Sequence, residues 1–328
     1  MLNFAEIELL KTSIWLEKAT KEERAQAKFR ESVTRMLTKE WDAHAKRALT
    51  AGLAAFDGKT TKRQAAEIIA AVESELKGFG DKSLPTVEKQ TEALYEAQVS
   101  MFLSKFGLKV QKATATGPRA SLAVNFTQKD KDAIKMLNSF TNISAGRLFP
   151  EQVMGKVAEV TSMIVLEEGQ STEVAAAELE KRLAEELTGA LGLDVGSLIP
   201  DAFATNPEAY FEVLANNAAV MGQNSGRLIG MEDAGVKFYR VAAVRDERTS
   251  EICKNMDGRV IEVKSGMGML NQMLDLSSPT ALAELFPWDS ARGNLGPNTL
   301  ENNNKLATGG LGFPPYHGNC RTTVVPEM

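Results

Sequence analysis

The spacing of apolar residues changes once along the chain, at Gly235. Before this glycine, apolar side chains recur every three or four residues over most of the chain, which is typical of amphipathic helices. After it, residues 236–244, 259–263 and 321–326 have the pattern of strands. We therefore predict an α+β protein, with a long, mostly helical N-terminal part followed by a small C-terminal α+β module with a short antiparallel sheet.

Turn and linker signals divide the chain into three regions. Residues 1–126 are expected to be helical, with a loop or short extended piece over 107–126. Residues 127–205 are expected to be a helical, acidic region that ends in a linker, with Thr127 as the first helix cap. Residues 206–328 are expected to form the α+β module.

The module begins with a strongly signalled helix. Asn206 is placed to cap it, and Pro207 occupies the first helical position. Gly222, Gly226 and Gly230 fall on one face of this helix, and each costs about 1 kcal/mol relative to alanine in a helix. Close packing against a sheet or another helix is the simplest compensation, and a ligand pressed against this face is the alternative.

The later part of the module is irregular in sequence. Residues 265–312 are polar and rich in glycine and asparagine, with one short apolar helix expected near 281–286. Long irregular insertions in compact domains usually have a function or are mobile. We therefore expect an extended loop that leads into the last strand.

The composition is that of a globular protein, with 43% hydrophobic and 25% charged residues. The first 15 residues do not form a signal peptide, no apolar run could span a membrane, and two cysteines cannot make a disulfide framework. We therefore expect folding in a reducing cytoplasm.

Residues 1–150 carry 24 basic against 18 acidic side chains, and 151–328 carry 14 against 25. Solvated helix faces explain this asymmetry most simply, with an acidic or nucleic-acid partner as the alternative.

One of the two histidines and one of the two cysteines lie three positions apart, as His317 and Cys320. Cys253 follows the first predicted strand, so the three side chains converge if the strands pair. Imidazole and thiolate are ligands that zinc prefers, which makes bound zinc one interpretation. A structural cluster without metal and a catalytic site are the others. The second histidine, His44, is expected on a solvated helix face.

Charged residues flank this group. A fourth ligand could come from Asp246, Asp257 or water. An ion pair between Asp246 and either Arg248 or Arg321 could fix the connection through bidentate hydrogen bonds. Asp257 and Gly258 close the connection as a turn before the second strand.

The order and spacing of these residues over about 206–326 resemble the phage Mu F-like minor head protein (head morphogenesis) family. The matching residues are Gly226, Arg227, Gly235, Val236, Asp246, Arg248, Thr249, Cys253, Asp257, Gly258, Pro314, Pro315, His317, Asn319, Cys320 and Arg321. Many members of that family close with Cys-Arg-Cys, whereas this chain has Thr322 at the last position. That departure leaves a set of four metal ligands incomplete.

The resemblance implies a minor capsid protein of a tailed phage. Such a protein would lie inside the virion head near the portal, after synthesis in the host cytoplasm, and would act in capsid assembly, DNA packaging or DNA delivery by protein–protein contacts. The portal protein is the expected partner, with scaffold, major capsid protein and packaged DNA as further ones and no membrane. The alternative is a packaged enzyme delivered to the host, either a metal-dependent hydrolase or an effector similar to ADP-ribosyltransferases.

The residues expected to meet in space form a structural cluster in the module rather than a catalytic site. They are Asp246, Arg248, Cys253, Asp257, Gly258, His317, Asn319, Cys320 and Arg321.

Overall fold

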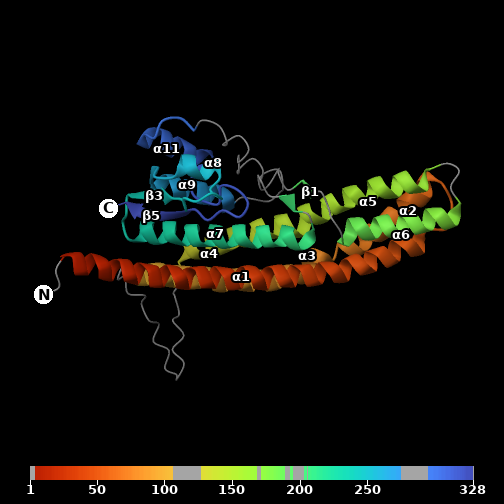
Figure 1. The fold of residues 1–328 in the computed structure, drawn as a ribbon, viewed down its shortest axis with the longest axis horizontal. Helices are drawn as coiled ribbons and strands as arrows, with labels where there is room; N and C mark the ends of the chain where they lie inside the picture. The colour runs from red at the N-terminus through yellow and green to blue at the C-terminus, as the bar shows by residue number, and fades with distance from the viewer. Residues whose placement is uncertain are drawn as a thin grey trace, which may run out of the picture.

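The protein is elongated, with helix α1 (Phe4–Ala55) running along most of its length (Figure 1). The C-terminal module lies at one end of the helical part, and the α5–α6 pair lies at the other. The computed structural model describes residues 4–105, 127–167, 171–188, 193–194, 203–204, 206–274 and 295–327. Within these ranges it describes the side chains of residues 21–102, 127–167, 171–188, 206–274 and 295–327.

The N-terminal part is helical, as the apolar spacing predicts. Its described elements are α1, α2 (Lys62–Leu76), α3 (Phe79–Lys105), α4 (Gln128–Ile143), the π-helical turn η1 (Ser144–Leu148), α5 (Phe149–Val165) and α6 (Thr172–Thr188). In α2, for example, the buried Ile68, Val72 and Leu76 lie on one face. Thr127 caps α4 in a capping box with Asp130, so the predicted cap is confirmed. The loop predicted at 107–126 lies outside the described residues.

Aromatic rings join distant helices at the centre of the helical part. The ring centroids of Trp41 in α1 and Phe149 in α5 are 4.5 Å apart, and those of Trp41 and Phe79 in α3 are 5.4 Å apart. Phe149 also lies 4.8 Å from Phe211 of α7. All three predicted regions therefore contribute side chains to one hydrophobic core.

Helix α7 (Pro207–Asp233) connects the helical part to the C-terminal module. Its cap is Asn206, whose Oδ1 accepts from the Ala209 N–H at 2.8 Å. The helix is buried on nearly all sides, because it packs against α1, α3 and α4 and also against the strand β5. The polar side chains of a helix surrounded in this way need hydrogen-bond partners in the neighbouring elements.

The three glycines of α7 face neighbouring helices. A Cβ added at Gly222 would lie 3.3 Å from Leu137 of α4, and one at Gly226 would lie 3.0 Å from Val99 of α3. At Gly230 the added Cβ would lie only 2.6 Å from Phe102 of α3. The backbone of α7 thus approaches α3 and α4 closely, and at Gly230 a side chain would require its neighbour to move.

The module contains a three-stranded antiparallel sheet in the order β4–β3–β5. Its strands are β3 (Phe238–Ala242), β4 (Val260–Glu262) and β5 (Thr323–Glu327). Phe238 of β3 pairs with Glu262 of β4 and with Glu327 of β5. A second, two-stranded pair, β1 (Leu193–Asp194) with β2 (Phe203–Ala204), forms within the segment predicted as a linker.

Two predictions about the module's connections were incomplete. The connection between the first two strands contains a helix, α8 (Glu251–Met256). The segment 265–312 is not wholly irregular, because α9 (Val263–Leu274), α11 (Leu300–Leu306) and the π-helical turn η3 (Ala307–Leu311) lie in it. The short helix predicted near 281–286 lies outside the described residues.

His44 is not solvated, contrary to its predicted place on a helix face. It is 2% exposed, its Nδ1 lies 2.7 Å from the carbonyl oxygen of Glu75, and its ring stands edge-on to Phe79. The spacing of α1 placed it correctly on a helix, but α2 and α3 cover that face.

The predicted α+β class is confirmed by a long helical N-terminal part and a small antiparallel sheet near the C-terminus. Within the described ranges, none of the helices combines the length and apolar character needed to cross a membrane.

Candidate metal centre

Antiparallel pairing of β3 with β5 brings the two halves of the His/Cys group together. Val241 of β3 lies opposite Val324 of β5, so the segment after β3 leaves the sheet where the segment before β5 enters it. Cys253 lies in α8, whose cap Ser250 accepts from the Cys253 N–H through its Oγ. His317 and Cys320 lie just before β5.

The three side chains meet in a compact, buried group. His317 Nε2 lies 3.2 Å from Cys253 Sγ, and the two sulfur atoms are 3.7 Å apart. All three donor atoms lie within 4.8 Å of one another, and both cysteines are free and buried. Cys253, His317 and Cys320 could therefore hold a metal ion.

Thr322 is a fourth member of the group that the predicted ligand set does not include. Its Oγ1 donates to Cys253 Sγ at 3.0 Å, and the residue is 2% exposed. Thr322 is the residue at which the sequence departs from the Cys-Arg-Cys ending of the family that it resembles. Asp246 and Asp257, which were predicted as possible fourth ligands, are not part of this group. Asp246 pairs with Arg321, and Asp257 pairs with Arg245.

The two thiols differ in their readiness to ionise. Burial alone would raise the pKa of Cys320, but its hydrogen bonds with Cys253 and His317 outweigh burial and hold that pKa well below its usual value. The hydrogen bond with Cys320, together with burial, raises the pKa of Cys253. Metal binding would require both thiols to lose their protons.

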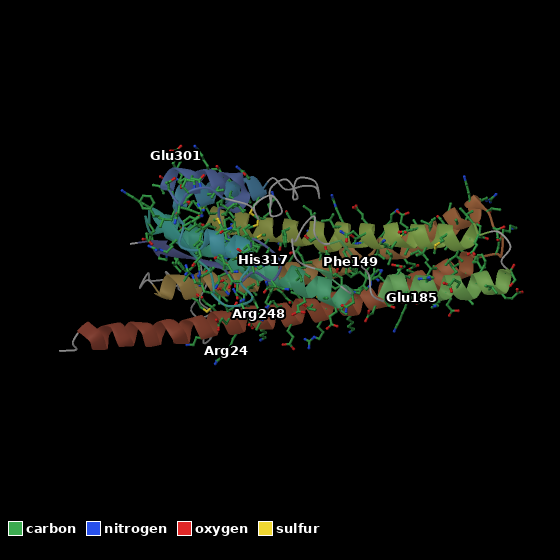
Figure 2. All side chains as sticks on the ribbon, turned by 45° about the horizontal axis from the view of Figure 1, so that its top comes forward. Arg24, Phe149, Glu185, Arg248, Glu301 and His317 are labelled. Atoms are coloured by element: carbon green, nitrogen blue, oxygen red, sulfur yellow. The ribbon has the colours of Figure 1, made fainter. Side chains whose placement is uncertain are left out.

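Asp246 organises the loop beside this group. Its Oδ1 accepts from Arg321 Nη2 at 2.6 Å and from the Arg248 N–H at 3.0 Å, and Thr249 Oγ1 lies 3.3 Å away. The hydrogen bond from Arg321 is the main reason why the pKa of Asp246 falls to about 2. The predicted pairing of Asp246 thus involves the Arg321 side chain and the Arg248 backbone. Figure 2 shows Arg248 and His317 in the same part of the module.

Asp257 and Gly258 hold the other end of the loop. Asp257 Oδ1 accepts from the Ala243 N–H at 2.9 Å. Gly258 has a φ of +76°, which a side chain would disfavour, and its N–H donates to the Val241 carbonyl. Asn319 also adopts a positive φ, +56°, in the turn between His317 and Cys320.

Buried polar side chains of α7 hold the segment that carries His317 and Cys320. Asn224 accepts from the Val324 N–H at 3.0 Å, and its amide nitrogen lies 3.4 Å from the Thr322 carbonyl oxygen. Arg227 donates to the Val324 carbonyl at 3.1 Å. The predicted cluster omitted Asn224, because an asparagine within an apolar helix carries no sequence signal for what it contacts.

A small space lies against the cluster, next to a larger cavity of about 480 Å³ that His317 also lines. A cavity of about 10 Å³ is lined by Cys253, His317, Thr322 and neighbouring loop residues. This is about the space needed for one water molecule. A metal ion held here would join α8 to the segment before β5.

No protein-family model, no curated protein and no solved structure matches this chain.

Proposed function

We propose that this protein is a minor head protein of a tailed phage, associated with the portal inside the capsid. The observation that carries the proposal is the clustering of the motif residues on which the sequence resemblance rests. Arg227, Asp246, Cys253 and Cys320 are spread over about a hundred residues of sequence, yet all lie around the junction of α7, α8 and β5. Their mutual contacts support the interpretation of these residues as one structural unit.

The shape of the molecule supports an assembly role. The module is a small, rigid unit, because α7 and the Asp246 and Asp257 contacts hold its loops in place. The long helices extend away from it and offer an extended surface (Figure 1). Contacts of such helices with portal, scaffold or major capsid protein would position the module at one vertex, where packaged DNA is a further neighbour.

The test uses the full chain and its cognate phage. Co-expression with the portal protein should give a complex that survives size-exclusion chromatography, and mass spectrometry should detect the chain in purified heads. Deletion of the gene should yield heads defective in DNA content or delivery. Normal infectious particles that lack the protein, together with no portal complex, would overturn the proposal.

We further propose that Cys253, His317 and Cys320 hold a structural zinc ion. Two sulfur ligands of one tetrahedral zinc, each at about 2.3 Å, lie about 3.8 Å apart. The two sulfur atoms here are 3.7 Å apart, which matches that separation. The Thr322 hydroxyl or a water would complete four ligands, and zinc would supply a cross-link between α8 and the β5 edge.

Metal analysis of the purified full chain tests this proposal. We expect one zinc per chain, lost in Cys320→Ala, and a lower unfolding temperature after chelation of the wild-type protein. A protein that folds with equal stability without zinc would favour the thiol cluster without metal instead.

A further inference from the structure

A cavity of about 480 Å³ lies between α1, α7 and the loops that flank the candidate metal centre. Three arginines from separate parts of the chain line it: Arg30 of α1, Arg248 after β3 and Arg321 before β5. Glu212 of α7 is the carboxylate among the lining residues. The volume lies within the range of ligand pockets. The positive charge is local, because the chain as a whole carries a net charge of −5.

Two of these guanidinium groups have donors to spare. Arg30 Nη1 donates to Asn216 Oδ1 at 3.0 Å, but its Nε is buried and finds no acceptor among the described residues. The Arg248 guanidinium makes no hydrogen bond or ion pair within the described part of the chain, where only its backbone N–H is engaged. A guanidinium carries five N–H donors in a fixed plane, which matches the two oxygens of an oxyanion.

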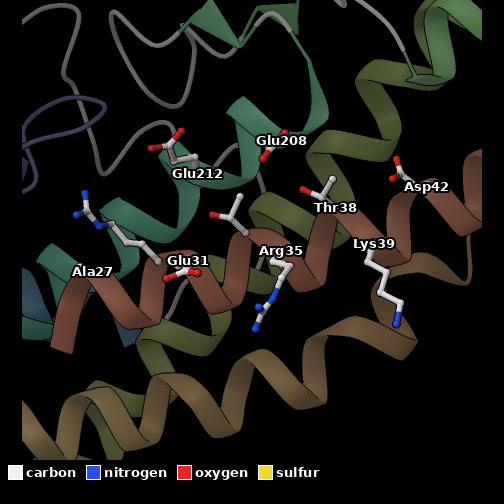
Figure 3. Close-up of a pocket in the computed structure, with 10 residues that line it drawn as sticks. Ala27, Glu31, Arg35, Thr38, Lys39, Asp42, Glu208 and Glu212 are labelled. Atoms are coloured by element: carbon white, nitrogen blue, oxygen red, sulfur yellow. The ribbon is translucent and has the colours of Figure 1, made fainter. Parts of the chain in front are cut away.

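The residues around the cavity favour a peptide carboxylate over the phosphates of a nucleic acid. No Phe, Tyr or Trp is among the described residues that line it, so a nucleobase would find no ring to stack on. The adjoining cavity along α1 shares Arg30 and Glu212 with it. In all, four carboxylates and three basic side chains line that cavity: Glu31, Asp42, Glu208, Glu212, Arg30, Arg35 and Lys39. Figure 3 shows Glu208 and Glu212 of α7 across from Glu31 of α1. A nucleic-acid strand, with a charge on every nucleotide, would meet these carboxylates beside the arginines.

An acidic peptide segment fits these surroundings better than a nucleic-acid strand does. It can present one isolated carboxylate to the arginines, while its backbone N–H groups face acceptors such as Glu212 and Asn216. We propose that this pocket binds the carboxylate of an acidic peptide segment carried by a protein partner. In a head-assembly protein such a contact would select an acidic loop of a neighbouring head component. The proposal does not require that role, because it rests only on the residues that line the pocket.

Fluorescence polarisation with the full chain tests the proposal directly. The probe is a capped, fluorescein-labelled peptide of glycine and serine with two aspartates, compared at fixed ionic strength with its asparagine counterpart and with an oligothymidylate. We expect the aspartate peptide to bind and the asparagine peptide not to bind. Arg248→Gln should weaken binding about tenfold, as the loss of a charged hydrogen-bonding group does.

Two further variants separate binding from folding. Arg30→Gln should weaken binding similarly, and circular dichroism checks its fold because Arg30 also holds Asn216. Arg63→Gln makes the same charge change on an exposed face of α2 and should leave affinity within about twofold.

Three results would overturn the inference. They are no binding of the aspartate peptide up to millimolar concentration, equal binding by Arg248→Gln and wild type, and tighter binding of the oligothymidylate that is lost in Arg248→Gln. The last would identify a nucleic-acid site. None of them bears on the portal complex, which is measured separately.

Discussion

At the scale of single residues, Thr322 decides how complete the candidate metal centre is. Its hydroxyl lies 3.0 Å from Cys253 Sγ, within reach of an ion shared by the three ligands. Thr322→Cys would place a fourth strong ligand there without changing the backbone. We expect zinc affinity to rise at least tenfold, measured by competition with a chromogenic chelator.

Thr322→Val is the matched control for this substitution. It keeps the shape of the side chain and adds no ligand, so its zinc affinity should equal or fall below that of the wild type. Equal affinity in Thr322→Cys and wild type would mean that the position does not face the ion.

Asn224 is the residue on which the segment before β5 depends most. Its amide is fully buried and serves both the Val324 N–H and carbonyl oxygens of neighbouring residues. Asn224→Ala leaves these backbone groups without partners, which should lower the free energy of unfolding by about 2–3 kcal/mol in urea titrations.

The neighbouring Asn217 provides a control for Asn224. It is equally buried, but its amide atoms have no hydrogen-bond partner among the described residues. Asn217→Ala should therefore cost clearly less than Asn224→Ala. Equal losses would show that burial, and not the hydrogen bonds, sets the cost.

Residue chemistry could be predicted from the sequence only where the residue type is distinctive. Cys253, His317 and Cys320 are rare residues placed beside predicted strands, and that sufficed to predict that they meet. Asn224 and Thr322 are common residue types whose role depends on what lies opposite them. His44 was misjudged for the same reason, because its helix face is covered by elements from later in the chain.

At the scale of elements, the packing of α7 on α3 depends on Gly230. An added Cβ would lie 2.6 Å from the ring of Phe102, so the ring or one of the two helices must shift. Gly230→Ala should therefore lower the free energy of unfolding by about 1–3 kcal/mol, despite the better helix propensity of alanine. Urea or thermal unfolding measures the change.

Gly155 in α5 gives the opposite expectation for the same substitution. An added Cβ there meets nothing within 4 Å. Gly155→Ala should thus raise stability by up to about 1 kcal/mol. A stabilised Gly230→Ala variant would mean that the helices adjust freely.

Elements could be predicted where periodicity and end signals agree. The cap residues Thr127 and Asn206 and the strands of the sheet illustrate this, because each has a local cause. Helix α9 was missed although Met267, Leu270 and Met273 repeat at helical spacing, since two glycines lower the local helix propensity. Burial of its methionines against the module compensates, and that contact is not local in sequence.

At the scale of the whole molecule, α1 is tied to the C-terminal module by a buried ion pair. Glu22 and Arg227 lie 205 positions apart, and their charged atoms are 2.6 Å apart, with side chains 6% and 9% exposed. Gln223 also donates to Glu22. Neither the pairing nor the docking of α1 on the module follows from local sequence, because both depend on how the intervening helices fold back.

Removing one member of this pair leaves the other charge buried. Glu22→Gln should lower the free energy of unfolding by about 3–5 kcal/mol, because Arg227 keeps its charge without a counter-ion. The rate of backbone amide hydrogen exchange should rise in the first half of α1 and also in β5, which Arg227 holds as well.

Lys129→Gln is the control, because it removes the half-exposed ion pair with Glu232. It should lower the free energy of unfolding by at most about 1 kcal/mol. If Glu22→Gln were as mild as Lys129→Gln, with unchanged exchange in α1, then apolar packing alone would hold α1 on the module and the ion pair would only set its register.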